Sequence, residues 1–318
     1  MKTQQKTPTG QYVTIVPKKE KVNRSKAEKI IIWVVFVILS IYAFTLIYPF
    51  FYLLINSMRD VTSFKENVLG LPKGFDDAIK NIKANYSYMF VAKDFNVPMM
   101  FFNTIVLSIG QTVVGMALSC IAAYVLAKYQ FKGNNFIYIA TIVASMVPTV
   151  GAAPATYKLM LDGGFLTKPG AMGYLYNYLG MMLMVGAFGG PFLYLHSFFK
   201  AIPWSYGESA QLDGAGEFRI FLQIMLPLAS NGVMTFTIMR FLGAWNEYWG
   251  AYLYFGSIFT ERETIAVGLN RISQDADNKG RLVELFAAMI VMITPVLVFY
   301  AIFQKQLMRN TIGGGLKG

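Results

Sequence analysis

Six stretches of this sequence contain no Lys, Arg, Asp or Glu and are long enough to cross a lipid bilayer. They cover residues 30–58, 95–127, 133–157, 169–199, 220–239 and 285–304. A helix needs about 20 mostly apolar residues to span a hydrocarbon core of roughly 30 Å, and each stretch reaches that length. The sequence therefore predicts an all-α membrane protein with six transmembrane helices.

The overall composition agrees with a membrane protein and excludes several other classes. The chain of 318 residues is 55% hydrophobic and 14% charged, yet its formal net charge is +11. A soluble nucleic-acid-binding protein with that charge would carry it in polar sequence, whereas the mean hydropathy here is +0.45. One cysteine and one histidine exclude a disulfide scaffold and a cysteine-rich zinc site, so we predict no metal centre. The apolar composition likewise predicts no nucleic-acid partner.

Basic residues near the helix ends predict the orientation. With six spans both termini lie on one side, and that side would carry 15 Lys and Arg against 12 on the other. Acidic residues follow the opposite pattern, with five on the side of the termini and 11 in the other loops. Because positive charge stays in the cytoplasm, both termini are expected there, where the charge also meets anionic lipid.

This topology divides the chain into five parts. They are a cytoplasmic tail at 1–29, a first transmembrane helix at 30–56, an extracytoplasmic loop at 57–98, a five-helix core at 99–304 and a cytoplasmic tail at 305–318. The loop at 57–98 is long and mixed in charge, which predicts a small folded cap rather than a linker.

The cytoplasmic segment at 200–227 is the most informative part of the sequence. Ser205 and Glu208 have the spacing of a capping box, which predicts a helix that begins at Ser205. Asp213 and Gly214 then predict a stop and a turn, and apolar residues at helical spacing before Pro227 predict a second helix. Four small residues would leave the backbone near the turn open to a close partner: Ala210, Gly214, Ala215 and Gly216.

The same segment resembles the EAA motif of the membrane subunits of binding-protein-dependent ABC importers. That motif places Glu-Ala-Ala, then Gly after three residues, then Ile-x-Leu-Pro after nine more. The matching residues are Glu208, Ser209, Ala210, Gly214, Ile224, Leu226 and Pro227, with Ser209 standing where Ala is usual. Residues 122–133, 198–203, 213–215 and 241–248 resemble the carbohydrate-uptake branch, the MalG-like permeases. The resemblance implies the type I (MetI-like) permease fold.

The resemblance also implies partners and a mechanism. It implies a multi-pass permease subunit in a prokaryotic plasma (inner) membrane, which pairs with a second permease as a heterodimer, with two cytoplasmic ATPase subunits and with an extracytoplasmic solute-binding protein. The helix at 205–213 would be the coupling helix, seated in a cleft of one ATPase through Glu208, Ser209, Ala210, Asp213, Gly214 and Ala215. Glu208 is expected both to cap this helix and to pair with a basic residue of the ATPase. The C-terminal end resembles a tail that reaches the ATPases near their Q-loops: Gly315, Leu316, Lys317 and Gly318.

No G-x-x-x-x-G-K-[ST] motif occurs in the chain, so no P-loop is predicted. The subunit is therefore expected to be non-catalytic and to hold no cofactor of its own, with ATP and Mg²⁺ bound by the partner ATPases.

Two charged residues in the fifth span suggest a translocation path. Arg240 and Glu247 lie seven residues apart and share one helix face, and an intramembrane charge normally faces a cavity or a partner. Trp245, Asn246 and Tyr248 lie beside them, and aromatic faces with amide groups suit sugars, which present apolar C–H faces rimmed by hydroxyls. The alternative is a structural role at the contact between the two permeases, which is favoured for Arg240 and weighs equally for Asn246 and Glu247.

Three other functions were compared with a carbohydrate importer. An ABC importer for a polyamine, an amino acid or a phosphate-bearing solute would share the coupling segment, although residues 198–203 and 245–247 favour sugars. An ion-coupled secondary transporter predicts inverted repeats, and none is visible in the sequence. A membrane enzyme needs a cluster of acid, base or metal-binding groups, which spans with one histidine do not supply.

Overall fold

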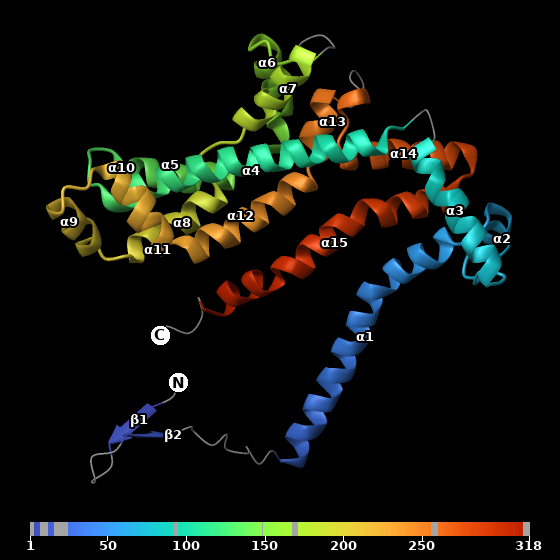
Figure 1. Ribbon diagram of the computed structural model, residues 1–318, viewed down its shortest axis with the longest axis horizontal. Helices are drawn as coiled ribbons and strands as arrows, with labels where there is room; N and C mark the ends of the chain where they lie inside the picture. The colour runs from blue at the N-terminus through green and yellow to red at the C-terminus, as the bar shows by residue number, and fades with distance from the viewer. Residues whose placement is uncertain are drawn as a thin grey trace. The chain divides into compact units, whose positions relative to one another are not determined.

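The computed structural model describes residues 3–6, 12–15, 25–91, 95–147, 149–166, 171–255 and 260–313. Apart from one short hairpin near the N-terminus, the regular structure of these residues is helical, which confirms the predicted fold class (Figure 1). The chain divides into two units, Met1–Tyr52 and Leu53–Gly318. The predicted ATPase contacts at Gly315, Leu316, Lys317 and Gly318 lie outside the described residues.

The first unit consists of an antiparallel hairpin and most of a long helix. The hairpin pairs β1 (Thr3–Lys6) with β2 (Tyr12–Ile15), and the helix is α1 (Lys26–Ser57). A capping box begins α1, because the Glu28 N–H donates to Ser25 Oγ (3.2 Å) and the Ser25 N–H donates to Glu28 Oε2 (3.0 Å). Most of α1 is apolar, and the helix is long enough to cross a membrane.

The loop at 57–98 contains two helices, which agrees with the prediction of a folded cap. They are α2 (Val61–Glu66) and α3 (Phe75–Val91). Asp60 caps α2, because its side chain accepts a hydrogen bond from the Ser63 backbone N–H (2.9 Å). That bond holds the pKa of the Asp60 carboxyl below its ordinary value, since it favours the charged form.

Asn85 on α3 connects the cap to the end of α1. Its amide donates to the backbone oxygens of Ser57 (2.8 Å) and Arg59 (3.0 Å). The ring of Phe64 on α2 packs edge-on against Phe286, with centroids 5.3 Å apart. The cap is therefore held by both polar and apolar contacts.

Four helices pack against one another at the centre of the second unit. They are α4 (Val97–Lys128), α8 (Gly190–Ala201), α12 (Ser230–Trp245) and α15 (Leu282–Gly313). Three further helices, α9 (Ser205–Leu212), α10 (Glu217–Ile220) and α14 (Ile265–Lys279), lie at the ends of this group. Figure 1 shows α9 and α10 at one end of α4, and α14 with α2 and α3 at the other. The segment expected in the cytoplasm and the loops expected outside thus lie at opposite ends of the same helix.

Three of the predicted spans are divided rather than continuous. The pieces are α5 (Asn134–Met146), the 3-10 helix η1 (Thr149–Ala152) and α6 (Ala153–Asp162) in the third, α7 (Ala171–Leu183) and α8 in the fourth, and α10, the π-helix η2 (Phe221–Met225), α11 (Leu226–Leu228), α12 and α13 (Trp249–Phe255) in the fifth. Counting windows of uncharged residues cannot detect such breaks, because they depend on single Pro and Gly residues.

Proline and glycine explain three of these breaks. Val147 ends α5 in an extended conformation (ψ 124°), because the residue before a proline disfavours helical backbone and Pro148 follows in the sequence. Gly189 has φ of 139°, and Pro191 then occupies the first turn of α8. Pro227 lacks a backbone N–H, and the helices on either side of Ala229 are bent by 81°.

By length and composition, three described helices could cross a membrane: α1, α4 and α15. The bent pair on either side of Ala229 would make a fourth. Non-helical backbone is tolerated at membrane depth where it is buried in protein or lines a cavity, so the divided spans are compatible with crossing. The count of six spans and the cytoplasmic termini stay predictions.

Candidate functional site

The segment at 200–227 forms a helix that begins at Ser205, as predicted, but the expected capping box is wrong. Trp204 stands at the N-cap with helical backbone (φ −68°, ψ −20°), and no side chain caps the helix. A capping side chain must come from a residue outside the helix, where the backbone directs it to the N–H two or three residues later. Ser205 already lies inside the first turn, so Glu208 is not a capping residue.

The predicted turn after α9 is present and depends on Gly214. Asp213 is the C-cap, and Gly214 has φ of 79°, a conformation that glycine adopts without strain. The Ala215 N–H donates to Ala210 O (2.9 Å) and the Gly214 N–H donates to Gln211 O (3.0 Å). These two bonds satisfy carbonyls at the end of the helix and hold the turn against it.

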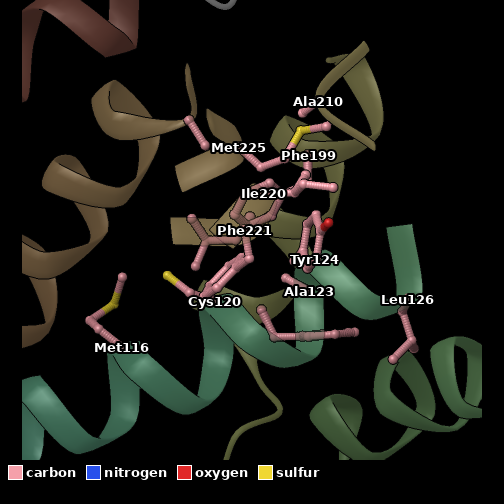
Figure 2. Close-up of a cluster of buried hydrophobic side chains, with 13 residues drawn as sticks. Met116, Cys120, Ala123, Tyr124, Leu126, Phe199, Ala210, Ile220, Phe221 and Met225 are labelled. Carbon is pink, nitrogen blue, oxygen red and sulfur yellow. The ribbon is translucent and has the colours of Figure 1, made fainter. Parts of the chain in front are cut away.

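α9 has a buried face and an exposed face. Ala210 is buried with Phe199 and Ile220 in an apolar cluster that includes the end of α4 (Figure 2). The exposed residues are Glu208, Ser209, Asp213 and Gly214, while Ala215 is half-buried. Ala210 therefore does not belong to the surface that a partner could touch. Its small side chain instead lets α9 approach the rest of the chain closely.

Large apolar side chains accompany the exposed polar residues of this segment. Leu212 is 90% exposed, Phe218 71% and Tyr206 51%. Apolar side chains gathered on a segment that also carries Glu208, Asp213 and Arg219 are typical of a protein–protein contact. The segment thus combines a buried anchor with a surface suited to another protein.

The predicted path residues face two different sides of the fifth span. Trp245, Asn246 and Tyr248 line a cavity of about 660 Å³, together with residues of α14 and α15. Asn246 also donates to Leu242 O (2.8 Å) in its own helix. These three residues therefore lie where α12 meets α14 and α15.

Glu247 lies on the other side, where two cavities adjoin. One has a volume of about 460 Å³ and is lined by Gln111, Arg240 and Glu247. The other, of about 430 Å³, is lined by Gln111 and Glu247 with residues of α6 and α13. Arg240 and Glu247 therefore share one face, as the sequence predicts. We refer to these two spaces as the Glu247 cavities.

Arg240 occupies a space that a glycine on α4 leaves open. A Cβ at Gly115 would lie 2.3 Å from Arg240 Nε. The guanidinium also donates from Nε to Gln111 O over 3.4 Å, and no ion pair joins it to a carboxylate of the described residues. An intramembrane cation in that position normally faces water, ligand or a partner.

Sequence reasoning missed a buried polar network at the other end of α4. Asn103 is fully buried and donates to the backbone oxygens of Glu261 (3.0 Å) and Glu263 (2.9 Å). Tyr174 donates to Asn103 Oδ1 (2.5 Å). These bonds hold the 3-10 helix η3 (Thr260–Arg262) against α4. The closely spaced charges at 261–263 were a signal, but they lie between the uncharged stretches at 220–239 and 285–304, which gave no sign of their burial.

Two charges of this network are buried outside the spans. Arg262 is fully buried and donates to Asn177 Oδ1, and Glu263 pairs with Arg271 (2.9 Å). Burial raises the pKa of the Glu263 carboxyl, and the charge of Arg271 opposes that shift. The network joins distant parts of the chain at the end of α4 that lies opposite the segment at 200–227.

An exposed segment of two helices and a turn lies at one end of long apolar helices, and the cavities between those helices contain a few polar groups. These features are typical of a multi-pass membrane protein that works with other proteins. The chain belongs to the family described as binding-protein-dependent transport system inner membrane component, whose model matches residues 115–312. The matched range includes the whole segment at 200–227 and both charged residues of the Glu247 cavities.

Relatives with named functions cover most of the chain. The diacetylchitobiose uptake system permease protein NgcG of Streptomyces coelicolor is 27% identical over 85% of this chain and 84% of its own length. The arabinooligosaccharides transport system permease protein AraQ of Bacillus subtilis is 26% identical over 86% of this chain and 91% of its own. The maltodextrin transport system permease protein MdxG of the same organism is 30% identical over 68% of this chain and 74% of its own.

Solved structures support the fold. A chain from the crystal structure of a bacterial ABC transporter that imports the acidic polysaccharide alginate aligns with a TM-score of 0.69 and 22% identity, over 89% of this chain and 98% of its own. A second chain comes from the alginate transporter in complex with its pentasaccharide-bound periplasmic protein, with a TM-score of 0.55 and 18% identity, over 86% and 95%. The predicted permease fold is therefore confirmed.

Proposed function

We propose that this chain is a transmembrane permease subunit of an ATP-driven importer for carbohydrates, taken up as oligosaccharides or polysaccharide fragments. The observation that carries the proposal is membership of the transport family together with relatives that are aligned over most of their length and named for saccharide transport. An importer of the same class for a non-sugar solute is the alternative. A binding-protein-dependent family does not fit an ion-coupled secondary transporter.

The sugar passes along the side of the fifth span that carries Arg240 on α12 and Glu247 after it. The Glu247 cavities have the chemistry that a saccharide needs. Tyr194 and Phe236 stack with centroids 4.9 Å apart on the wall of the larger one and offer an aromatic surface to C–H faces. Gln111 and Glu247 offer hydrogen bonds to hydroxyls.

Trp245, Asn246 and Tyr248 have a supporting role in this proposal. They line the separate cavity beside α14 and α15, so they set the position of α12 and do not touch a solute in the Glu247 cavities. This division follows from the geometry of the fifth span, because α12 ends at Trp245 and the chain turns at Asn246 before α13.

The chain acts with four other subunits. Two cytoplasmic ATPases bind ATP and Mg²⁺, a second permease completes the membrane path as a heterodimer, and a solute-binding protein delivers the sugar from outside. The periplasmic protein in the alginate transporter complex supports the last of these partners. Since this sequence carries no P-loop motif, ATP hydrolysis belongs to the ATPases.

The coupling segment contacts one ATPase through its exposed face. Glu208, Ser209, Asp213 and Gly214 are accessible there, with Leu212 and Phe218 as the apolar part of the contact. Closure of the ATPases displaces α9 as a rigid body, and the core helices change between inward-open and outward-open packings. The tail at Gly315–Gly318 makes a second contact with the ATPases.

Uptake by the complete transporter tests this function. The subunits are reconstituted in proteoliposomes with ATP on the ATPase side, and uptake is measured for labelled maltotriose, arabinotriose, diacetylchitobiose, spermidine and glutamate with the binding protein present. We expect ATP-dependent uptake of a saccharide. Uptake of only spermidine or glutamate would overturn the carbohydrate assignment.

Two alanine variants test the path. Glu247→Ala should lower saccharide uptake, because it removes a polar group shared by both Glu247 cavities. Asn246→Ala is the matched control, since this neighbour lines the other cavity. Unchanged uptake by Glu247→Ala would remove this face from the path.

A further inference from the structure

The carboxylate of Glu217 connects α9, α10 and the end of α4. Tyr129, directly after α4, donates from its hydroxyl to Glu217 Oε2 on α10. Gln211 on α9 donates from Nε2 to Oε1 of the same carboxylate (2.9 Å). Glu217 is therefore bonded both to the helix before the turn and to the end of α4.

Aromatic packing holds Tyr129 in place for this bond. Its ring lies edge-on to Trp204 (centroids 5.8 Å apart) and to Tyr124 (5.6 Å). The hydroxyls of Tyr124 and Tyr129 are 3.1 Å apart, and the Tyr124 ring packs at 4.9 Å from Phe221 in the cluster shown in Figure 2. Burial raises the pKa of the Tyr129 hydroxyl, so it stays a donor at physiological pH.

The backbone between these contacts changes its direction and its hydrogen-bonding pattern. α9 has eight residues, and the turn that follows contains a glycine with positive φ. α10 has four residues and continues into the five-residue π-helix η2, whose hydrogen bonding differs from that of an α-helix. A displacement of α9 could therefore change the backbone at 213–216 and in α10 without moving α4. A side-chain contact that joins α9 and α10 to the end of α4 would prevent this.

α4 is the element that leads from this contact to the cavities. It contributes Gln111, which lines both Glu247 cavities, and Gly115, which admits Arg240. α4 is continuous from Val97 to Lys128, so a movement at its last turn reaches these residues without a break in the helix.

We propose that Tyr129 is a positioning residue that acts through Glu217 and fixes the coupling segment to α4. A displacement of α9 then moves α4 instead of opening the turn at 213–216. The inference rests on the proposed function, because it takes the movement of α9 to be driven by an ATPase. It assigns a role in coupling to a residue outside the coupling segment.

Substitutions of the two bonded residues test the proposal in the reconstituted transporter. ATP hydrolysis and saccharide uptake are measured in the same proteoliposomes, and copurification of the ATPases is measured for every variant. Tyr129→Phe removes the hydroxyl and keeps the ring that packs on Trp204. We expect ATP hydrolysis within about twofold of the wild type and a fall of about tenfold in uptake per ATP, as loss of a hydrogen bond to a charged group predicts.

The acceptor is tested with two matched variants. Glu217→Gln should keep most of the uptake per ATP, because an amide oxygen still accepts from the Tyr129 hydroxyl. Glu217→Ala should lose at least as much as Tyr129→Phe, because it also removes the acceptor of the Gln211 bond. The double variant with Tyr129→Phe and Glu217→Ala should lose no more than Glu217→Ala alone, since that substitution already removes the bond to Tyr129. Tyr138→Phe is the control, because it removes a tyrosine hydroxyl elsewhere and keeps the ring that packs on His196 with centroids 4.6 Å apart.

Three contrary results would overturn the positioning role, and a fourth would refute the proposed function. Tyr129→Phe with normal uptake per ATP would overturn the positioning role, and so would Glu217→Gln with the same loss as Glu217→Ala. A parallel loss of hydrolysis and uptake in fully assembled Tyr129→Phe would also overturn it, because that pattern indicates general damage. Absence of ATP-dependent saccharide uptake by the wild type would instead refute the proposed function.

Discussion

The buried amide of Asn103 offers the sharpest test of the energetics of the core. The Asn103→Leu substitution keeps the approximate volume of the side chain and removes every hydrogen bond. The backbone oxygens of Glu261 and Glu263 then lose their donor, and the Tyr174 hydroxyl loses its acceptor. The two side-chain hydrogen bonds from α4 to the backbone oxygens at 261 and 263 would then be lost.

The expected cost follows from the number of groups left without a partner. A buried polar group that loses its partner costs about 1–3 kcal/mol. Tyr174 is partly exposed and can turn to water, so we count only the two backbone oxygens and expect about 3 kcal/mol. Because 1.4 kcal/mol is tenfold in an equilibrium constant, local opening of this region should become about a hundredfold more frequent.

Amide hydrogen exchange measures this opening directly. The Ile265 N–H donates to Thr104 Oγ1 (2.8 Å) next to Asn103, so peptides that cover 260–268 should exchange about a hundredfold faster in the variant. Asn81→Leu is the control, since Asn81 makes one long bond of 3.4 Å to Met58 O and should change exchange by less than about threefold. Exchange within threefold of the wild type in Asn103→Leu would refute the reasoning.

Three further predictions concern the turn, the cavity and the cap. Gly214→Val places a β-branched residue at φ of 79°, which costs about 1–2 kcal/mol, and should reduce copurification of the ATPases without lowering the melting temperature of the core. Gly115→Val displaces the guanidinium of Arg240 and should destabilise the core by about 1–3 kcal/mol, measured as a lower melting temperature in detergent. The pKa of Asp60 is lowered in the folded chain. Its contribution to stability is therefore complete above the ordinary pKa and is lost as pH falls through the lower folded value. Asp60→Asn should remove this loss below about pH 4, measured as melting temperatures between pH 3 and 6.

Matched variants separate these effects from general damage. Gly216→Val is the control for the turn, because Gly216 has negative φ and open space around it. Gly243→Ala is the control for the cavity, since a Cβ there would meet nothing within 4 Å. Normal ATPase copurification by Gly214→Val, an unchanged melting temperature for Gly115→Val, or the same acid profile for Asp60→Asn and the wild type would each contradict the corresponding prediction.

The coupling segment shows how far local sequence signals reach. The start of α9 at Ser205 and the turn at Gly214 were predicted correctly, because they depend on backbone preferences of a few neighbouring residues. The capping box was wrong, since the spacing of Ser205 and Glu208 does not reveal that Trp204 is already helical. The buried position of Ala210 also needed the structure, because a small residue suits both a core and a contact surface.

The divided spans have a similar explanation. Absence of charge over about 20 residues identifies a segment that tolerates lipid, but it does not require one continuous helix. Pro148, Gly189 and Pro227 interrupt three of the stretches, and their effect depends on whether the surrounding structure can satisfy the freed backbone groups. Those partners come from other helices and are absent from any local window.

The sequence alone determined the features that depend on residues near one another in the chain: the apolar stretches, the charge asymmetry and the spacing of Glu208, Gly214 and Pro227. These features predicted the membrane class and the permease family, and the family is confirmed. Contacts across the chain were decided only by tertiary packing. The Tyr129 and Glu217 side chains meet over a separation of 88 residues, and Asn103 meets the Glu261 oxygen over 158. The physical reason is that hydrophobic burial is non-directional, so it selects segments for a core or a membrane without specifying which faces meet. Which cavity Glu247 lines, and which hydroxyl reaches Glu217, depends on the close packing of particular helices.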